Sequence, residues 1–109
     1  MTALGSLAFA LSAFGASTAS TVSVTAGKPT ELRFVVLPKS VAKGAVTFKV
    51  VNKGTLVHDF KIAGKKTPRL AKGKSATLRV TFAKAGKYPY LCTLPGHAAG
   101  GMKGVLTVK

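Results

Sequence analysis

The stretch "SATLRVTF", Ser75–Phe82, alternates apolar and polar residues with a period of two. In a strand, one face would carry the apolar residues Ala76, Leu78, Val80 and Phe82. The other face would carry the polar residues Thr77, Arg79 and Thr81. This period is typical of a β-strand with one buried face, because successive strand residues point to opposite sides. "AVTFKVVN", Ala45–Asn52, repeats the pattern, so the two segments predict strands that share a core.

Further short runs rich in β-branched and aromatic residues flank these two strands: "TELRFVVL", "VHDFKIA", "KYPYLC" and "GVLTVK". "TVSVTA", residues 21–26, is expected to be the first edge strand. Turn markers built from glycine, proline and lysine separate the runs. Strands at this spacing predict an all-β fold, an antiparallel Greek-key β-sandwich of about seven or eight strands.

The chain has 109 residues, which suggests one folded domain. The apolar run "LGSLAFALSAFGA", Leu4–Ala16, is followed by "STAS", a small-residue cleavage pattern near Ala19. We interpret residues 1–19 as a signal peptide and residues 20–109 as the mature domain. The first six residues carry no lysine or arginine, so an uncleaved N-terminal anchor and a buried helix remain alternatives. Export to the periplasm or another extracytoplasmic space is expected. The alternative is an exported domain that stays associated with the membrane through the N-terminal segment.

The charge balance is strongly positive. Seventeen lysines and arginines face two acidic residues, Glu31 and Asp59, which gives a formal net charge of +15. Such a field attracts anionic partners and keeps the protein soluble. Adaptation to an acidic medium is an equally good explanation, because a chain with few carboxylates loses little stability in acid.

The uncharged segment "YLCTLPGHAAGGM", Tyr90–Met102, holds the only cysteine of the chain and one of its two histidines. Cys92, His97 and Met102 follow a C-x4-H-x4-M spacing. Each residue alone is more often core filler or surface than a ligand. Their placement together favours a role as metal ligands. Cys92 ends one expected strand, Met102 precedes the next, and His97 lies in the flexible loop between them.

His58, in "NKGTLVHDF", follows a turn and begins another expected strand, 34 residues before Cys92. In a Greek-key sandwich, segments so far apart in sequence can meet at one end of the two sheets. Two imidazoles, one thiolate and a weak axial thioether form the donor set of a blue-copper site. A structural zinc site is disfavoured, because a thioether is a poor zinc ligand.

The sequence resembles the cupredoxins, the small blue copper proteins related to plastocyanin, auracyanin and azurin. The resemblance is carried by "NKGTLVHDF" and "GKYPYLCTLPGHAAGGMKGVLTV", which follow the family pattern of a histidine after an N-x-G turn, then G-x-Y-x-[FY]-x-C, histidine, methionine and G-x-[LIV]-x-V. It implies one copper ion, cycling between Cu(I) and Cu(II), with the ligands His58, Cys92, His97 and Met102.

Two further residues are expected to support the ligands. Where the family often has asparagine after the first histidine, this chain has Asp59, and we pair Asp59 with Thr93 across the site. An ionised carboxylate there should lower the reduction potential. A strand-start residue bridged to a nearby lysine is the alternative for Asp59. Asn52 is interpreted as a turn former rather than a support for the ligands.

These features favour one-electron transfer over catalysis. The metal would use both histidines, which leaves no general base, so no enzyme activity is expected. The neutral residues around His97 form a small docking patch in this interpretation, comprising Leu94, Pro95, Ala98 and Ala99. By the resemblance, electrons pass through His97.

Redox proteins with an acidic docking surface are the expected partners. We expect a monomer and no nucleic-acid binding, and association with a membrane surface stays open. Two other functions compete with electron transfer: copper delivery or storage in the cell envelope, which would hold colourless Cu(I), and the binding of polyanions, which would fall steeply with salt and ignore copper.

Overall fold

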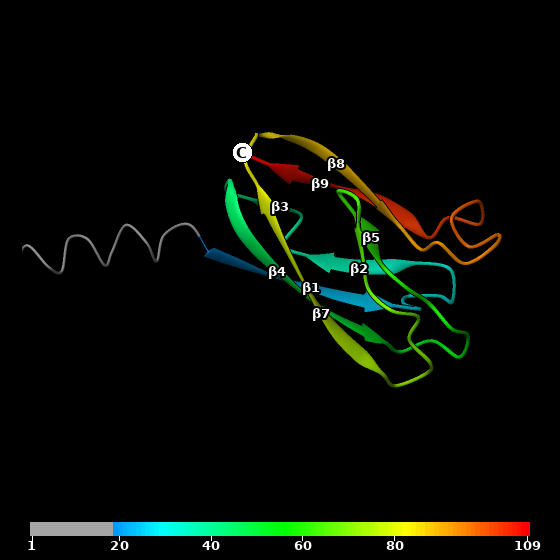
Figure 1. The fold of residues 1–109 in the computed structure, drawn as a ribbon. Helices are drawn as coiled ribbons and strands as arrows, with labels where there is room; N and C mark the ends of the chain where they lie inside the picture. The colour runs from blue at the N-terminus through cyan, green and yellow to red at the C-terminus, as the bar shows by residue number, and fades with distance from the viewer. Residues whose placement is uncertain (1–18) are drawn as a thin grey trace, which may run out of the picture.

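A computed structural model describes residues 19–109 as a sandwich of two β-sheets (Figure 1). The first sheet has the order β2-β1-β4-β7, formed by β2 (Phe34–Leu37), β1 (Ala19–Ala26), β4 (Gly44–Asn52) and β7 (Ser75–Phe82). The second has the order β3-β9-β8-β5-β6, formed by β3 (Ser40–Val41), β9 (Lys103–Val108), β8 (Gly86–Leu91), β5 (Lys61–Ile62) and β6 (Lys65–Lys66). The predicted all-β sandwich is confirmed.

The sheets are mixed rather than purely antiparallel. β1 pairs in parallel with β4, and β3 pairs in parallel with β9. After β2 the chain crosses to the second sheet through β3, and it therefore re-enters the first sheet in the direction of β1. The expectation that residues 21–26 form an edge strand is wrong, because β1 lies between β2 and β4.

The alternation seen in the sequence becomes the division between core and surface. On β4 the side chains of Val46, Phe48 and Val50 are buried, while Lys49 between them is exposed. Phe60 links the core to the loops beyond β4. Its ring is 5.4 Å from that of Phe48 and 5.3 Å from that of Tyr90, so a cluster of tilted aromatic rings packs this part of the sandwich.

The loops that matter for function gather at the end of the sandwich that lies opposite the start of β1 (Figure 1). β1, β4 and β8 all finish there, and β9 begins there. Residues 1–18, which hold most of the expected signal peptide, lie outside the described residues. Within residues 19–109, no helix is long and apolar enough to cross a membrane.

Candidate metal centre

The loop between β8 and β9 is closed by its own backbone. The Cys92 N–H donates to the Met102 carbonyl at 3.1 Å, and the Met102 N–H donates to the His97 carbonyl at 3.0 Å. Gly100 donates to the carbonyls of Gly96 and His97 at 3.0 and 3.1 Å. Cys92 and Met102 are therefore neighbours across the base of the loop, and His97 is held between them.

His58 reaches the same place from a different segment. It forms an isolated antiparallel bridge with Leu70 instead of beginning a regular strand as predicted. The buried Asn52 fixes both sides of this bridge, because its Nδ2 donates to the carbonyls of Leu56 (2.8 Å) and Leu70 (2.7 Å). Its Oδ1 accepts from the Gly54 N–H at 2.8 Å. The interpretation of Asn52 as only a turn former is therefore too narrow: it ties down the segment that carries a ligand.

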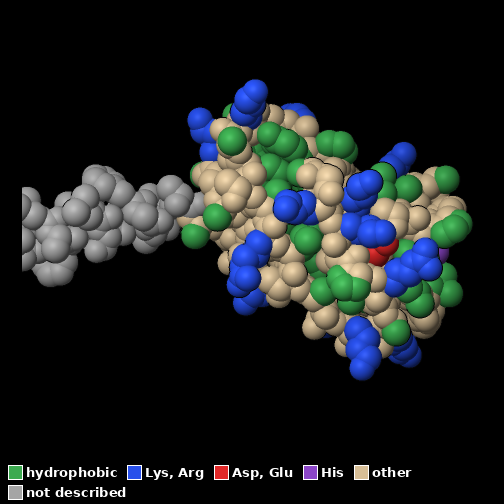
Figure 2. All heavy atoms as spheres, viewed as in Figure 1, with side chains coloured by type: hydrophobic (Ala, Val, Ile, Leu, Met, Phe, Trp, Pro, Cys, Tyr) green, Lys and Arg blue, Asp and Glu red, His purple; other side chains and the backbone are tan. Residues whose placement is uncertain are grey.

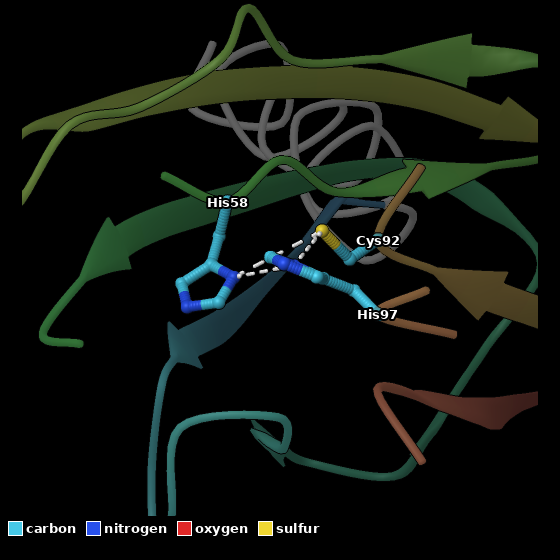
Figure 3. A group of neighbouring side chains, drawn as sticks. All are labelled: His58, Cys92 and His97. Carbon is cyan, nitrogen blue, oxygen red and sulfur yellow. Dashed lines mark hydrogen bonds between the residues drawn. The ribbon is translucent and has the colours of Figure 1, made fainter. Parts of the chain in front are cut away.

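Three donor atoms converge at this end of the sandwich (Figure 3). His58 Nδ1 lies 3.2 Å from His97 Nδ1 and 4.0 Å from Cys92 Sγ, and the His97 Nδ1 to Cys92 Sγ distance is 3.5 Å. A metal bonded at about 2.0–2.3 Å to three donors in one plane separates them by about 3.5–4.0 Å. The two distances to sulfur lie in this range and the distance between the two nitrogens is about 0.3 Å shorter, so a small shift of one ring fits the triangle to a single metal ion. His58 and Cys92 are buried, whereas His97 is partly exposed.

The fourth predicted ligand, Met102, is completely buried. It forms a small apolar cluster with Cys92 and Ala26, against which Leu32 and Leu94 pack. A polarisable thioether in a water-free position beside a thiolate suits copper and suits zinc poorly. The donor chemistry of the residues present thus fits copper.

Asp59 and Thr93 meet as the sequence predicted. The Asp59 carboxylate accepts from the Thr93 backbone N–H at 2.6 Å and also from the Thr93 hydroxyl. The alternative of a lysine bridge finds no support, because the only ion pair among residues 19–109 joins Glu31 to His58. The Asp59 N–H donates to Cys92 Sγ at 3.4 Å, an interaction that favours the thiolate. Burial acts in the opposite direction and raises the pKa of the Cys92 thiol.

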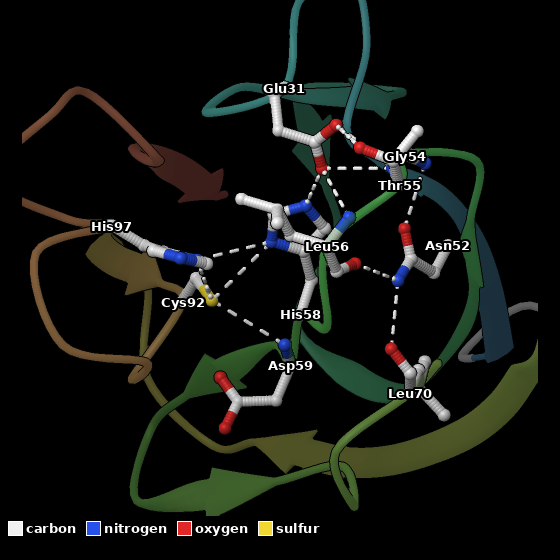
Figure 4. A network of polar contacts seen from close by, with 10 residues as sticks. All are labelled: Glu31, Asn52, Gly54, Thr55, Leu56, His58, Asp59, Leu70, Cys92 and His97. Atoms are coloured by element: carbon white, nitrogen blue, oxygen red, sulfur yellow. Dashed lines mark hydrogen bonds and ion pairs between the residues drawn. The ribbon is translucent and has the colours of Figure 1, made fainter. Parts of the chain in front are cut away.

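Sequence reasoning missed Glu31, which lies on the far side of the His58 ring (Figure 4). Its Oε2 is 2.5 Å from His58 Nε2, the nitrogen that points away from the donor triangle. The sequence offered one signal for Glu31: it is one of only two acidic residues in a chain with seventeen basic residues.

The predicted docking residues surround the partly exposed His97. Pro95 and Ala99 are exposed, and Leu94 and Ala98 are half-buried. The segment before His58 adds two apolar side chains that the sequence analysis did not include, with Leu56 49% and Val57 40% exposed. Both ligand-bearing loops therefore present apolar side chains to solvent.

Comparison with known proteins identifies one family. The family described as "copper binding proteins, plastocyanin/azurin family" matches residues 3–109. The copper-resistant cuproprotein CopI of Pseudomonas aeruginosa is 51% identical over 37 residues, which are 34% of this chain and 20% of CopI. Auracyanin-B of Chloroflexus aurantiacus is 45% identical over 42 residues, which are 38% of this chain and 18% of auracyanin-B. The chain spans about a fifth of the length of the curated relatives it matches.

A solved structure extends the likeness to almost the whole described domain. The reduced auracyanin of Roseiflexus castenholzii superposes with a TM-score of 0.65 and 25% sequence identity. The match covers 85% of this chain and 98% of that auracyanin.

Replacing Asn52 with alanine tests whether the hydrogen bonds of its side chain hold the His58 segment in place. Asn52→Ala leaves the carbonyls of Leu56 and Leu70 without their donor, so the free energy of unfolding of the copper-free protein should fall by about 2–3 kcal/mol. Copper affinity should fall about tenfold or more, because the support of a ligand is lost. Denaturant unfolding and competitive copper titration measure the two effects.

Lys53→Ala is the matched control, since Lys53 is the exposed neighbour and a surface change should stay within about 0.5 kcal/mol. Equal stability and equal copper affinity in the two variants would show that Asn52 does not support the site.

Proposed function

The chain belongs to the plastocyanin/azurin family of copper-binding proteins, and on that premise we propose that it carries single electrons between redox partners outside the cytoplasm. The observation that carries the proposal is the convergence of His58, Cys92 and His97 within one 4.8 Å cluster beside the buried Met102. Bound copper would supply the Cu(I)/Cu(II) couple, with the two imidazoles and the thiolate as strong ligands and the thioether as the weak one.

The scaffold suits electron transfer because it limits movement of the ligands. The His58 bridge to Leu70 and the closed Cys92–Met102 loop fix the backbone on both sides of the site through hydrogen bonds that involve no metal. A centre whose ligands stay in place when the charge changes pays little reorganisation energy. Water is kept from the thiolate, because Cys92 is only 1% exposed.

His97 is the proposed route for electrons. It is the one ligand of the three clustered donors that is partly exposed, and it lies among the uncharged residues 94–101. A partner that docks on Pro95 and Ala99 would approach the metal through one imidazole ring. Leu56 and Val57 directly precede His58, whose ring lies 5.0 Å from that of His97, and their exposed apolar side chains support a brief, weakly specific complex.

An electron carrier fits the described residues better than an enzyme does. Both histidines and both acidic residues of the chain are engaged at the site, so residues 19–109 offer no separate acid–base pair for catalysis. Copper handling is the second candidate, favoured by the match to CopI, whose name describes a copper-resistant cuproprotein. A single buried cage is a poor design for rapid copper exchange.

Visible absorption separates the two candidates. The oxidised, copper-loaded protein should show an intense visible band, because a thiolate bonded to Cu(II) transfers charge to the metal. Cys92→Ala should abolish the band, whereas Val105→Ala, at an exposed position on β9, should leave it unchanged. Identical bands in wild type and Cys92→Ala, or a colourless protein that binds only Cu(I), would contradict electron transfer by this site.

Basic residues give the proposed carrier a means of attracting its partner. Lysine and arginine side chains are spread over the visible face of the domain and are not gathered in one patch (Figure 2). With a formal net charge of +15, the whole molecule is drawn toward an acidic redox protein. The apolar residues around His97 would then form the contact itself.

Electron exchange with an acidic redox protein should therefore slow as salt is added, by about tenfold or more between low and physiological ionic strength. Stopped-flow kinetics over a salt series measure this dependence. A small uncharged copper reductant provides the control, and its rate should stay flat. A rate with the acidic partner that is equally flat would remove electrostatic steering while leaving the copper site intact.

Export is proposed from the apolar run Leu4–Ala16 and the "STAS" pattern that follows it. Expression with this segment should deliver the domain to the extracytoplasmic fraction, and mass spectrometry of that fraction should find a chain starting near Ser20. A full-length chain anchored in the membrane would favour the uncleaved alternative. Recovery in the cytoplasm alone would contradict the proposed location.

A further inference from the structure

Both acidic residues of the chain lie beside the metal ligands. Asp59 contacts the Cys92 side of the site through Thr93, and Glu31 contacts the His58 side. The remaining charged residues are seventeen lysines and arginines. A chain that keeps two carboxylates and places both against one site uses them there for a purpose other than solubility.

The two ring nitrogens of His58 have different partners (Figure 4). Nδ1 faces His97 and Cys92, at 3.2 Å and 4.0 Å. Nε2 faces the Glu31 carboxylate at 2.5 Å. A carboxylate accepts hydrogen bonds and does not donate them, so it requires the proton on Nε2 and leaves the Nδ1 lone pair free for a metal.

Glu31 is itself held in place. Its carboxylate accepts from the Thr55 N–H at 2.9 Å, from the Thr55 hydroxyl at 2.9 Å and from the Leu56 N–H at 3.1 Å. The backbone hydrogen bond from Thr55 is the largest cause that lowers the pKa of Glu31 to about 2. The donated hydrogen bonds from Thr55 and Leu56 favour the ionised carboxylate over the protonated acid.

Glycines allow the Glu31 loop and the His58 segment to pack closely. A side chain at Gly54 would collide with the Glu31 carboxylate and would lie 3.0 Å from His58 Nε2. A side chain at Gly27, where φ is +83°, would collide with the backbone of Gly54. The carboxylate is thus held against the imidazole by the fold, although the Glu31 side chain remains 29% exposed.

We propose that Glu31 is a positioning residue of the copper site, which fixes the tautomer and orientation of His58 through Nε2 and lowers the reduction potential of the metal by its negative charge. This inference rests on the proposed function for its second half only, since the contact between His58 Nε2 and Glu31 involves protein atoms alone.

The direction of the potential follows from charge. A fixed negative charge behind a ligand stabilises Cu(II) more than Cu(I), because the oxidised ion carries one more positive charge. A carboxylate that accepts the other ring proton also makes the imidazole a more basic donor, which again favours Cu(II). One electron is added on reduction, and no proton has to move. Glu31 thus acts through His58, separately from Asp59, which acts beside Cys92.

The test compares Glu31→Gln with wild type in the full chain. Glutamine can still accept a hydrogen bond but carries no charge. The ratio of Cu(II) to Cu(I) affinity should fall about tenfold, which for a one-electron couple raises the potential by about 59 mV. Thr81→Lys adds the same unit of positive charge at the opposite end of the sandwich, where Thr81 pairs with Ala45, and it should leave the potential nearly unchanged.

A copper-free readout tests the orientation alone. Nitrogen-15 spectra of the apoprotein should place the His58 proton on Nε2, and Glu31→Ala should give a mixture of tautomers. If Glu31→Gln folds poorly, Glu31→Asp serves as the second variant. It keeps the negative charge and should therefore retain most of the lowering of the reduction potential.

Three outcomes would overturn the inference: a proton on Nδ1 in wild-type apoprotein, an unchanged potential in Glu31→Gln, or an equal change in Thr81→Lys. A wild-type protein without the visible band would instead overturn the proposed function, so the two failures are distinguishable.

Discussion

The whole site depends on holding His58 against a loop that begins 34 residues later in the chain. The backbone bridge to Leu70 and the two hydrogen bonds from Asn52 provide this constraint. The bridge and the hydrogen bond to Leu70 are buried, where hydrogen bonds do not compete with water, and the hydrogen bond to Leu56 is partly buried. Without them, the Cys92–Met102 loop would keep three donors, but the second imidazole would have no fixed place.

The surface of the domain and the surroundings of the ligands differ in charge. The exterior is strongly basic, while the loop from Cys92 to Met102 carries no charge and the only carboxylates flank the ligands. This division explains how a chain with a net charge of +15 can present a neutral face around His97 and still place negative charge behind the metal. In our proposal, the charge of Glu31 offsets part of a positive field that would otherwise favour Cu(I).

The sequence predicted the features that depend on local pattern. Alternation along β4 and β7 identified buried faces, and the C-x4-H-x4-M spacing identified a loop whose ligands are neighbours in sequence. Features that depend on distant segments were missed. The interior position of β1 follows from a parallel pairing with β4, and the role of Glu31 follows from the contact of two loops that no local period records.

The central claim is that the fold prepares a rigid copper cage before copper binds. Crystal structures of the apoprotein, the Cu(I) form and the Cu(II) form test it most directly. The account predicts one copper ion bonded to Nδ1 of both imidazoles and to the sulfur of Cys92, with these atoms displaced by no more than about 0.5 Å among the three forms. Copper bound elsewhere, or a His58 ring that swings into place only with the metal, would contradict it.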